Sequence, residues 1–428
     1  MRVARELIVG DPQRLGGYRL AGRLGAGGQG VVYEAYDAVG RRVAVKVLHG
    51  DAGSDPELRE RFGREAAAAR RVASFCTAGV LDADLDGPRP YIVSEYVEGP
   101  SLRGAGQIFG GDDLHALATA IAVALTALHD AGVVHRGLTP DKVFLGRDGP
   151  GVLGFGLSPG LGTALTATGL RPRAPSYTAP EVFTGGEAGT AADVFAWGGI
   201  VLYAASGEDP FAAGSLGAVM HRILSLDPDL SPLPRPLRPL AAAALAKDPR
   251  ARPTARDLLI ALIAAGQAAG QAVPRTDAPG SETVPLLRAG AEVAARVRTA
   301  CDDPGLGALA ESAFAALDPA DRERVPAVFL RLVVIDADGQ AVAREAGIPA
   351  GSEDVLHGFA GLVEHRGDRA YLVHQALPYA WPRLKEWIDA NRARLVARER
   401  SARLLPPLLA VSAVFALVAA AIAAGRIV

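Results

Sequence analysis

Residues 22–46, GRLGAGGQGVVYEAYDAVGRRVAVK, decide the fold of this 428-residue chain. The stretch begins with four closely spaced glycines, Gly25, Gly27, Gly28 and Gly30. Apolar residues alternate on both sides of Gly40, and this pattern predicts two strands joined by a turn. Glycine has no Cβ to block a close approach, so such a loop can cover phosphate groups, although a glycine-rich hairpin alone would show the same pattern.

Two charged residues give the glycine loop a chemical context. Lys46 ends the last strand of the stretch, where its ammonium would point at phosphates beneath the loop. Residues 56–72 have the apolar spacing of a helix, and Glu65 on this helix could hold Lys46 as an ion pair. A glycine loop, a lysine and a glutamate in this order predict a nucleotide site.

Further along the chain, the apolar pattern changes from strands to helices. Residues 91–96 form an apolar run typical of a buried strand, and residues 114–129 have strong helical spacing. Strand signals recur near Val143 and Val152, and helical spacing dominates residues 193–262. Strands followed by helices predict an α+β fold with one sheet-rich lobe and one helical lobe.

With these features, residues 18 to about 262 resemble the eukaryotic-type serine/threonine protein kinases of bacteria, the actinobacterial ones in particular. Further landmarks carry the resemblance. Ser94-Glu95-Tyr96-Val97 is similar to the hinge that bonds adenine, and Ala179-Pro180-Glu181 to the end of the activation segment. Asp193 resembles the aspartate that braces the catalytic loop, and Arg252 the arginine that pairs with Glu181. The resemblance implies a bilobal kinase-like fold over residues 18–265, with a β-rich N-lobe and a helical C-lobe.

The resemblance also implies which residues would surround a nucleotide. They are Gly25, Gly27, Gly30, Val32, Ala44, Lys46, Glu65, Glu95, Val97 and Phe144. The ligand expected there is ATP or ADP. Phe144 stands where the family usually has a smaller aliphatic residue beneath adenine, so its ring would fill part of the pocket.

The chain departs from the family at the residues that perform catalysis. In place of His-Arg-Asp-Leu-Lys-Pro-x-Asn it has His135-Arg-Gly-Leu-Thr-Pro-Asp-Lys142. Gly137 replaces the general base, Thr139 replaces the lysine that balances phosphate charge, and Lys142 replaces an asparagine that holds magnesium. Gly154 replaces the main metal ligand of Asp-Phe-Gly. No catalytic residue of the family is intact, and no metal site is expected.

These losses together predict a pseudokinase. A general base contributes about 10²–10⁴-fold to a rate, and metal stabilisation of the transferring phosphate several kcal/mol more. Lys142 would place a cation where magnesium sits in the family, which predicts nucleotide binding without magnesium. Two alternatives stay open. One is an active serine/threonine kinase with an atypical mechanism, and the other is an adaptor that binds no nucleotide.

After a linker at residues 266–290, a second and mainly helical domain is expected at residues 291–380. Its segments 313–317, 327–332, 374–377 and 381–387 resemble the winged-helix tail of STAND-type signalling NTPases. No Gly-x-x-x-x-Gly-Lys-Ser/Thr loop occurs anywhere in the chain. His374 is expected to pack against the fold and not to bind a ligand. A net charge of −2 gives no reason to expect nucleic acid, so protein partners, an active kinase among them, are the expectation.

The two ends of the chain are expected to differ. Residues 1–17 are expected to form a short leader. Residues 381–403 are expected to form a basic helix, and residues 404–425 contain no charge and are long enough to span a bilayer. Several arginines precede that segment, Arg392, Arg394, Arg398, Arg400 and Arg403, whereas Arg426 alone follows it. This asymmetry predicts a single-pass protein of the cell membrane with the kinase-like domain in the cytoplasm. Cys76 and Cys301 are expected to be reduced thiols.

Overall fold

The computed structural model describes residues 5–27, 30–48, 77–147, 149–154, 175–268, 283–297 and 303–399, together with residues 63, 67, 70 and 72. The chain divides into two compact units. Unit 1 comprises Met1–Val3, Leu24–Val32 and Ala44–Asp303. Unit 2 comprises Ala4–Arg23, Tyr33–Val43 and Pro304–Val428. Each unit has a hydrophobic core of its own.

Six strands form one sheet in the order β1-β2-β3-β4-β6-β5. They are β1 (Arg14–Leu15), β2 (Tyr18–Gly27), β3 (Gly30–Tyr36), β4 (Arg42–Leu48), β5 (Val80–Asp84) and β6 (Tyr91–Glu95). In β4 the side chains of Val43 and Val45 are fully buried while Ala44 and Lys46 are half-buried, which is the alternation of a strand with one face on a core. Gly40, at φ +87°, makes the turn before β4, so the hairpin predicted from the sequence is confirmed.

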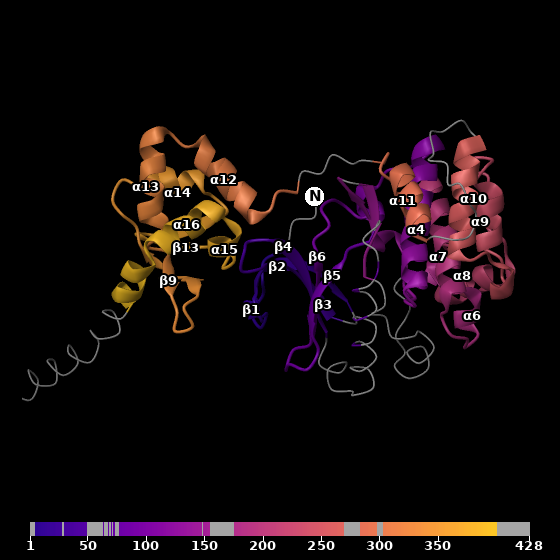
Figure 1. Cartoon of the computed structure of the whole chain (residues 1–428), viewed down its shortest axis with the longest axis horizontal. Helices are drawn as coiled ribbons and strands as arrows, with labels where there is room; N and C mark the ends of the chain where they lie inside the picture. Colours follow the sequence, from indigo (N-terminus) through magenta and orange to yellow (C-terminus); the bar gives the residue numbers. More distant parts are fainter. Residues whose placement is uncertain are drawn as a thin grey trace, which may run out of the picture. The chain divides into compact units, whose positions relative to one another are not determined.

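The helical part of unit 1 is built around α4 (Gly111–Asp130). This helix is apolar on all sides because neighbours cover it from several directions. The larger neighbours are α7 (Thr190–Ser206), α10 (Ala255–Ala268) and α11 (Thr283–Ala294), and α9 (Arg238–Ala244) packs on α7 (Figure 1). The predicted helix at residues 114–129 is thereby confirmed. Shorter elements complete the unit: α3 (Leu102–Ala105), α6 (Pro180–Phe183), α8 (Leu216–Ser225), the 3₁₀ turns Pro140–Lys142, Pro175–Tyr177 and Pro249–Ala251, and the hairpin of β7 (Val143–Gly146) with β8 (Gly149–Val152).

Among the described residues, α4 is also the one helix long and apolar enough to cross a membrane. Its most apolar window is 83% buried inside the protein, so we assign α4 to the core of the helical lobe. The segment predicted to span a membrane, residues 404–425, lies outside the described residues.

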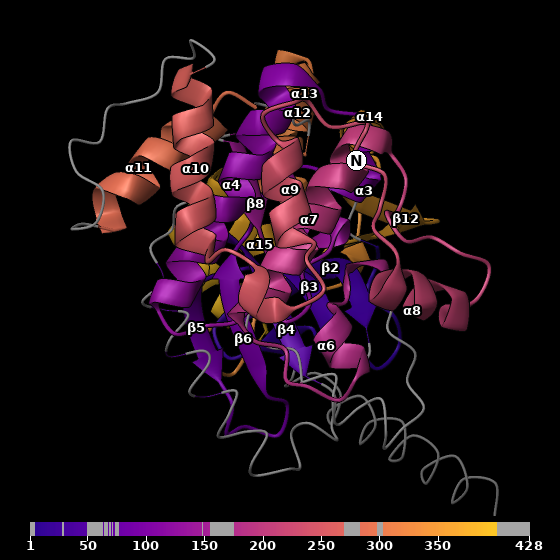
Figure 2. The same cartoon turned by 90° about the vertical axis from the view of Figure 1, so that its right-hand side faces the viewer.

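Helix α11 departs from the expected linker at residues 266–290. Its buried side chains include Leu287 and Val293, and they belong to the same core as α4. A β-carbon added to Gly290 would clash with Val123 and lie 3.0 Å from Leu259, so the helix approaches α4 and α10 as closely as glycine permits. Figure 2 shows α11 beside α10. The Gly, Pro, Ser and Thr content of the preceding residues hid this helix from the sequence pattern.

The described C-terminal part of unit 2 contains α12 to α16, further helical residues at 392–399 and two small sheets (Figure 1). The helices are α12 (Leu306–Ala316), α13 (Pro319–Phe329), α14 (Glu353–Gly358), α15 (Leu377–Ala380) and α16 (Pro382–Ala390). One sheet pairs β9 (Val333–Ile335) with β10 (Ala341–Ala343), and the other has the order β11-β13-β12, from Ala346–Gly347, Arg369–Leu372 and Val363–Arg366. The basic helix expected at 381–403 instead ends at Ala390, and helical residues resume at 392–399 after a turn at Asn391.

The core of unit 2 is centred on an indole. Trp381 is fully buried, and its ring centroid lies 5.3 Å from that of Phe329 and 5.5 Å from that of Phe359. The indole Nε1 donates to Glu311 at 2.8 Å, so its one polar atom is satisfied. Such a cluster of rings supplies most of the apolar area that a small domain needs.

The N-terminal residues 5–17, predicted as a leader, make ordered contacts in unit 2. Asp11 accepts two hydrogen bonds from Arg23, at 2.7 and 2.6 Å, and one from Tyr33 at 2.7 Å. The bonds from Arg23 lower the pKa of Asp11 to about 2. In the same unit, a hydrogen bond joins β3 to the C-terminal part. The Tyr36 hydroxyl accepts it from the amide of Leu306 at 2.8 Å.

Candidate nucleotide site and degenerate catalytic loop

Asp193, at the start of α7, holds the loop that would carry catalysis. Its carboxylate accepts from the amide of His135 at 2.7 Å and from the amide of Arg136 at 2.9 Å. His129 lies 2.9 Å from the same carboxylate. The Asp193 side chain is buried, so these bonds are made where water does not compete. They fix Arg136 at φ +59° and are the brace that the family resemblance implied.

His135 is fully buried and neutral. Its Nε2 donates to the carbonyl of Leu153 at 3.1 Å, since a carbonyl can only accept, and its Nδ1 accepts from the amide of Gly137 at 3.3 Å. Burial lowers the pKa of His135 to about 4. The negative charge of Asp193 opposes this shift, and the positive charge of Lys142 adds to it. The imidazole therefore holds the amide of Gly137, where the family has its general base, and joins this loop to Leu153.

The two positions that hold magnesium in the family lie together here. A β-carbon added to Gly154 would lie 2.8 Å from the Nζ of Lys142, 3.4 Å from its Cδ and 3.5 Å from its Cε. The amide of Leu153 donates to the carbonyl of Lys142 at 2.9 Å, which joins the backbones of the two segments. Gly154 has φ +77°, a conformation that glycine adopts without strain. The Lys142 side chain therefore fills the space that a metal-binding side chain at 154 would need.

Gly137 and Thr139 lie in the loop between the residues that Asp193 holds and the 3₁₀ turn. Gly137 follows the braced residues and presents no side chain. Thr139 precedes the 3₁₀ turn Pro140–Lys142, and its carbonyl accepts from the amide of Lys142 at 2.9 Å. Neither residue can accept a proton from a substrate hydroxyl as a carboxylate does, or balance phosphate charge.

The predicted nucleotide-binding residues come from several strands. Gly25 and Gly27 end β2, Gly30 and Val32 begin β3, and Ala44 and Lys46 lie on β4. Val32, Ala44 and Lys46 are half-buried. Gly28 and Glu65 lie outside the described residues, so the predicted pair of Lys46 with Glu65 stays a prediction.

The hinge residues begin at the end of β6 and continue beyond it. The carboxylate of Glu95 accepts from the amide of Gly79 at 3.1 Å, which turns it toward β5, and Val97 is half-buried. Tyr96 donates to Asp303 at 2.8 Å, a tie to the end of unit 1 that no sequence pattern signalled. Phe144, on β7, is 4% exposed, so its ring is packed inside the protein, and its predicted place beneath adenine stays a prediction.

Two further clusters support the helical lobe. Arg252 bonds both oxygens of Glu181 at 2.8 Å, and its side chain is completely buried. This is the pair that the resemblance implied. Sequence reasoning missed the second cluster, in which Arg103 binds Asp141 at 3.1 Å and Asp209 at 2.7 Å. Asp141, the carboxylate left in the degenerate loop, is thus held by an arginine.

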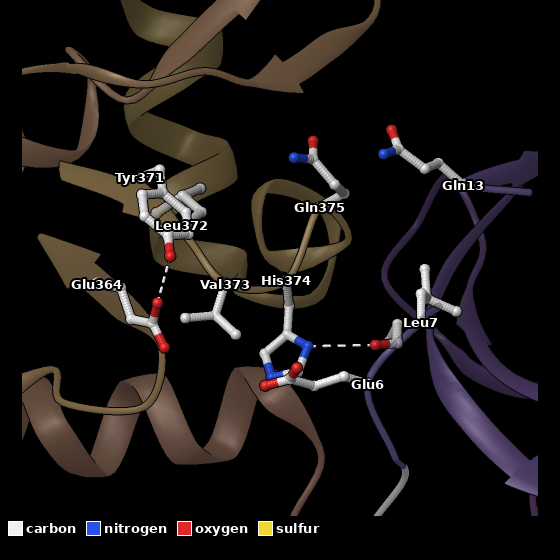
Figure 3. Close-up of a pocket in the computed structure, with 10 residues that line it drawn as sticks. Glu6, Leu7, Gln13, Glu364, Tyr371, Leu372, Val373, His374 and Gln375 are labelled. Carbon is white, nitrogen blue, oxygen red and sulfur yellow. Dashed lines mark hydrogen bonds between the residues drawn. The ribbon is translucent and has the colours of Figure 1, made fainter. Parts of the chain in front are cut away.

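Unit 2 has a pocket of about 290 Å³, shown in Figure 3. Its lining residues are Glu6, Leu7, Gln13, Ala21, Glu364, Tyr371, Leu372, Val373, His374 and Gln375. The Tyr371 hydroxyl donates to Glu364, and His374 Nδ1 donates to the carbonyl of Ala21 at 3.1 Å. His374 thus bonds a strand residue of unit 2 and also lines the pocket, so its role stays a prediction.

Two family models match separate parts of the chain. The protein kinase domain model matches residues 18–261, and the model named Novel STAND NTPase 1 matches residues 303–404. The kinase domain of PknI from Mycobacterium tuberculosis aligns over 59% of this chain and 96% of that one, at 26% identity and a TM-score of 0.47.

Curated relatives share the first part. A "Probable serine/threonine-protein kinase PkwA" of Thermomonospora curvata is 42% identical over 261 residues, and the serine/threonine-protein kinase AfsK of Streptomyces coelicolor is 40% identical over 258. These matches cover 60% and 59% of this chain, but 35% and 32% of those relatives. The kinase model alone spans more than half of the 428 residues, with the Asp193 brace and the Arg252–Glu181 pair inside it. The chain therefore belongs to the protein kinase family, of the eukaryotic type found in bacterial serine/threonine kinases.

Proposed function

We propose that this chain is a membrane-anchored pseudokinase, which binds ATP or ADP without transferring phosphate and acts as a scaffold or regulator of a partner protein. The observation that carries the proposal is the position of Lys142 against Gly154. The relatives named above are called kinases, so the proposed loss of activity rests on the residues of this chain that depart from the family motifs.

Charge opposes magnesium at this place. A divalent ion about 4 Å from an ammonium is repelled by about 8 kcal/mol at an effective dielectric constant of 20, twice the value for two unit charges. Both carboxylate and amide ligands of the family are missing, because Lys142 and Gly154 stand in their positions. In the part of the chain that the structure describes, no group of three His, Cys, Asp or Glu residues could hold a metal.

The residues of the N-lobe are suited to bind a nucleotide and not a metal ion. The backbone of the glycine loop and the Lys46 ammonium would hold its phosphates, and the hinge backbone at Glu95 and Val97 would hold its base. Lys142 would supply the positive charge that magnesium supplies in an active kinase, and Phe144 would narrow the base pocket. In this proposal, the bound nucleotide sets the arrangement of the two lobes and reacts with nothing.

Thermal unfolding of the full chain with ATP or ADP, with and without magnesium, tests this account. Bound ligand raises the unfolding temperature by mass action. We expect a rise that is equal in the presence of magnesium and of a chelator, and that disappears in Lys46→Ala. A rise that needs magnesium would contradict the metal-free site, and no rise with any nucleotide would favour the adaptor that binds none.

An active kinase with an atypical mechanism is the second candidate. The intact brace at Asp193 and the Glu181–Arg252 pair favour it, because both support catalysis in the family. The carboxylate left in the degenerate loop is that of Asp141, and Arg103 donates a hydrogen bond to it at 3.1 Å. Incorporation of labelled phosphate into the chain itself or into a generic protein substrate, abolished by Lys46→Ala, would establish this candidate in place of the pseudokinase.

Membrane anchoring is a separate part of the proposal. Residues 404–425 carry no charge, and the arginines that precede them favour a cytoplasmic body and an external C-terminus. A cysteine substituted for Val428 should react with an impermeant thiol reagent in intact cells. Reaction confined to cysteines placed before residue 403 would show the opposite orientation.

The second domain is the part proposed to recognise a protein partner, an active kinase or another signalling protein. Its match to a STAND family model and its buried aromatic core support a folded interaction domain, for which we propose a winged-helix-like fold. Co-purification of an active kinase with the full chain, lost on a charge substitution in this domain, would support that role. An unchanged set of co-purified proteins would count against it.

A further inference from the structure

Unit 2 brings together arginines that are far apart in sequence. The basic surface consists of Arg331, Arg344, Arg392, Arg394 and Arg398. Arg331 follows α13 and Arg344 follows β10, whereas the other three lie after α16. The sequence showed the last three as part of a basic run, but gave no sign that Arg331 and Arg344 join them.

Hydrogen bonds to backbone carbonyls hold this surface together. Arg398 donates to the carbonyl of Leu330 at 3.0 Å and to that of Val333 at 2.7 Å. Arg344 donates to the carbonyl of Arg331 at 2.9 Å. A carbonyl satisfies a guanidinium without neutralising its charge, so the positive charge of the surface is retained.

The electrostatic environment agrees with this arrangement. Burial lowers the pKa of Arg398, and the charges of Arg344, Arg331 and Arg394 lower it further, while Glu399 opposes them. Arg392 pairs with Asp389 at 3.1 Å, but both side chains are about half exposed, and such pairs are weak in water. These guanidinium groups therefore keep a positive charge that can attract an anionic partner.

The position of the surface along the chain indicates which anion it meets. Arg398 lies a few residues before the uncharged run 404–425. A surface so close to a segment of that length and composition must lie near the headgroups if the segment is embedded. Juxtamembrane basic residues are attracted to the anionic lipids of the cytoplasmic leaflet.

We propose that the basic surface binds the headgroups of anionic lipids and holds the second domain against the cytoplasmic face of the membrane. This inference rests on the proposed membrane anchoring. Duplex DNA, whose phosphates offer the same charge, is the alternative occupant, and it is an outcome of the test.

The test uses the full chain in vesicles of phosphatidylcholine alone, and in vesicles of equal parts phosphatidylcholine and phosphatidylglycerol. Cys76 and Cys301 are replaced by serine, and an environment-sensitive dye is attached at Ala337→Cys, an exposed position between β9 and β10. Flotation with the vesicles reports anchoring, and the emission of the dye reports contact of the surface with lipid. We expect the chain to float with both kinds of vesicle. The emission of the dye should shift to the blue only with the vesicles that contain phosphatidylglycerol, and raised salt should remove that shift.

Substitutions separate the surface from the anchor. Arg331→Gln with Arg344→Gln should leave flotation intact and lower the equilibrium constant for surface contact about 25-fold, since each basic residue near an anionic surface is worth about fivefold. Arg235→Gln with Arg366→Gln removes two exposed arginines elsewhere and should change nothing. Thermal unfolding of each variant confirms that it folds.

Three results would overturn the proposal. Flotation without a shift that depends on phosphatidylglycerol would leave the anchor intact and refute the lipid contact. Absence of flotation from both vesicles would refute the anchoring and the contact together. Abolition of the shift by a duplex oligonucleotide at a lower phosphate concentration than that of the lipid would assign the surface to nucleic acid.

Discussion

The ammonium of Lys142 lies 2.8 Å from the place that a β-carbon on Gly154 would take. These residues stand in the two positions that hold magnesium in the family, and the hydrogen bond from Leu153 to Lys142 joins their backbones. Their substitutions are therefore coupled, because a side chain restored at one position meets the residue at the other. The first prediction follows from this coupling.

Gly154→Asp alone should not restore a dependence on magnesium. The new carboxylate would meet Lys142 and pair with it, and a side chain at φ +77° strains the backbone by about 1–2 kcal/mol. Gly154→Asp with Lys142→Asn removes the competing cation and should make nucleotide-induced stabilisation depend on magnesium. Thermal unfolding with nucleotide and either magnesium or a chelator measures both variants. A magnesium-dependent rise in the single variant would refute the coupling.

The unaltered chain should transfer no phosphate to itself or to generic protein substrates, with magnesium or manganese. Restoring one position should not help, because a base and a metal act as a unit. The combined variant Gly137→Asp, Thr139→Lys, Lys142→Asn and Gly154→Asp is the one expected to show activity, and Lys46→Ala in that background is its control. Measurable transfer by any single restoration would contradict this account.

Phe144→Leu should strengthen nucleotide binding while it weakens the fold. Phe144 is 4% exposed, and shortening such a side chain leaves a cavity that costs about 1–3 kcal/mol. A ligand base can refill part of that space, so the nucleotide-induced rise in unfolding temperature should grow relative to the unaltered chain. A smaller rise in unfolding temperature would show that the Phe144 ring contacts the bound base and does not obstruct it.

Stability should fall as the pH drops below about 6.5, the ordinary pKa of an unfolded histidine. Burial lowers the folded pKa of His135 to about 4, so the unfolded state takes up a proton before the folded state does. The stability that His135 contributes is complete above the unfolded pKa and falls by up to about 3 kcal/mol toward the folded one. Burial shifts the pKa of His115 in the same direction.

Urea unfolding at several pH values tests this prediction, with His135→Gln as the comparison. Glutamine can donate to the carbonyl of Leu153 but does not titrate, so the variant should lose part of the slope. An identical pH dependence in the two proteins would assign the effect to other groups, His115 among them.

Arg252→Ala should destabilise the helical lobe by about 3–5 kcal/mol, because it leaves the Glu181 carboxylate without its buried partner. The matched control is Arg369→Ala, which breaks a pair with Glu345 at 2.7 Å whose side chains are 53% and 50% exposed. That exposed pair should be worth less than about 1 kcal/mol. Denaturant unfolding of both variants gives the comparison, and equal losses would contradict the importance of burial.

Local patterns predicted those elements whose burial follows a regular period. The hairpin that ends in Lys46 shows the alternation of a strand, and α4 shows continuous apolar spacing, so both were found from sequence. The site residues were found because they replace residues of a known motif. Two arrangements were not predicted from sequence: the contact between Lys142 and Gly154, and the proximity of Arg331 to Arg398. Both depend on how separate segments fold together, which no local pattern encodes.

Helix α11 also determines where a gene fusion can join this chain to another protein without exposing its core. The kinase model ends at residue 261 and the second model begins at 303, yet α11 lies between them and packs on α4. A gene fusion that replaced everything after residue 265 would leave the apolar side chains around Val123 and Leu259 facing water. A fusion at residue 303 would keep them covered. The folded unit that contains the kinase-like part therefore extends beyond the residues that the kinase model matches.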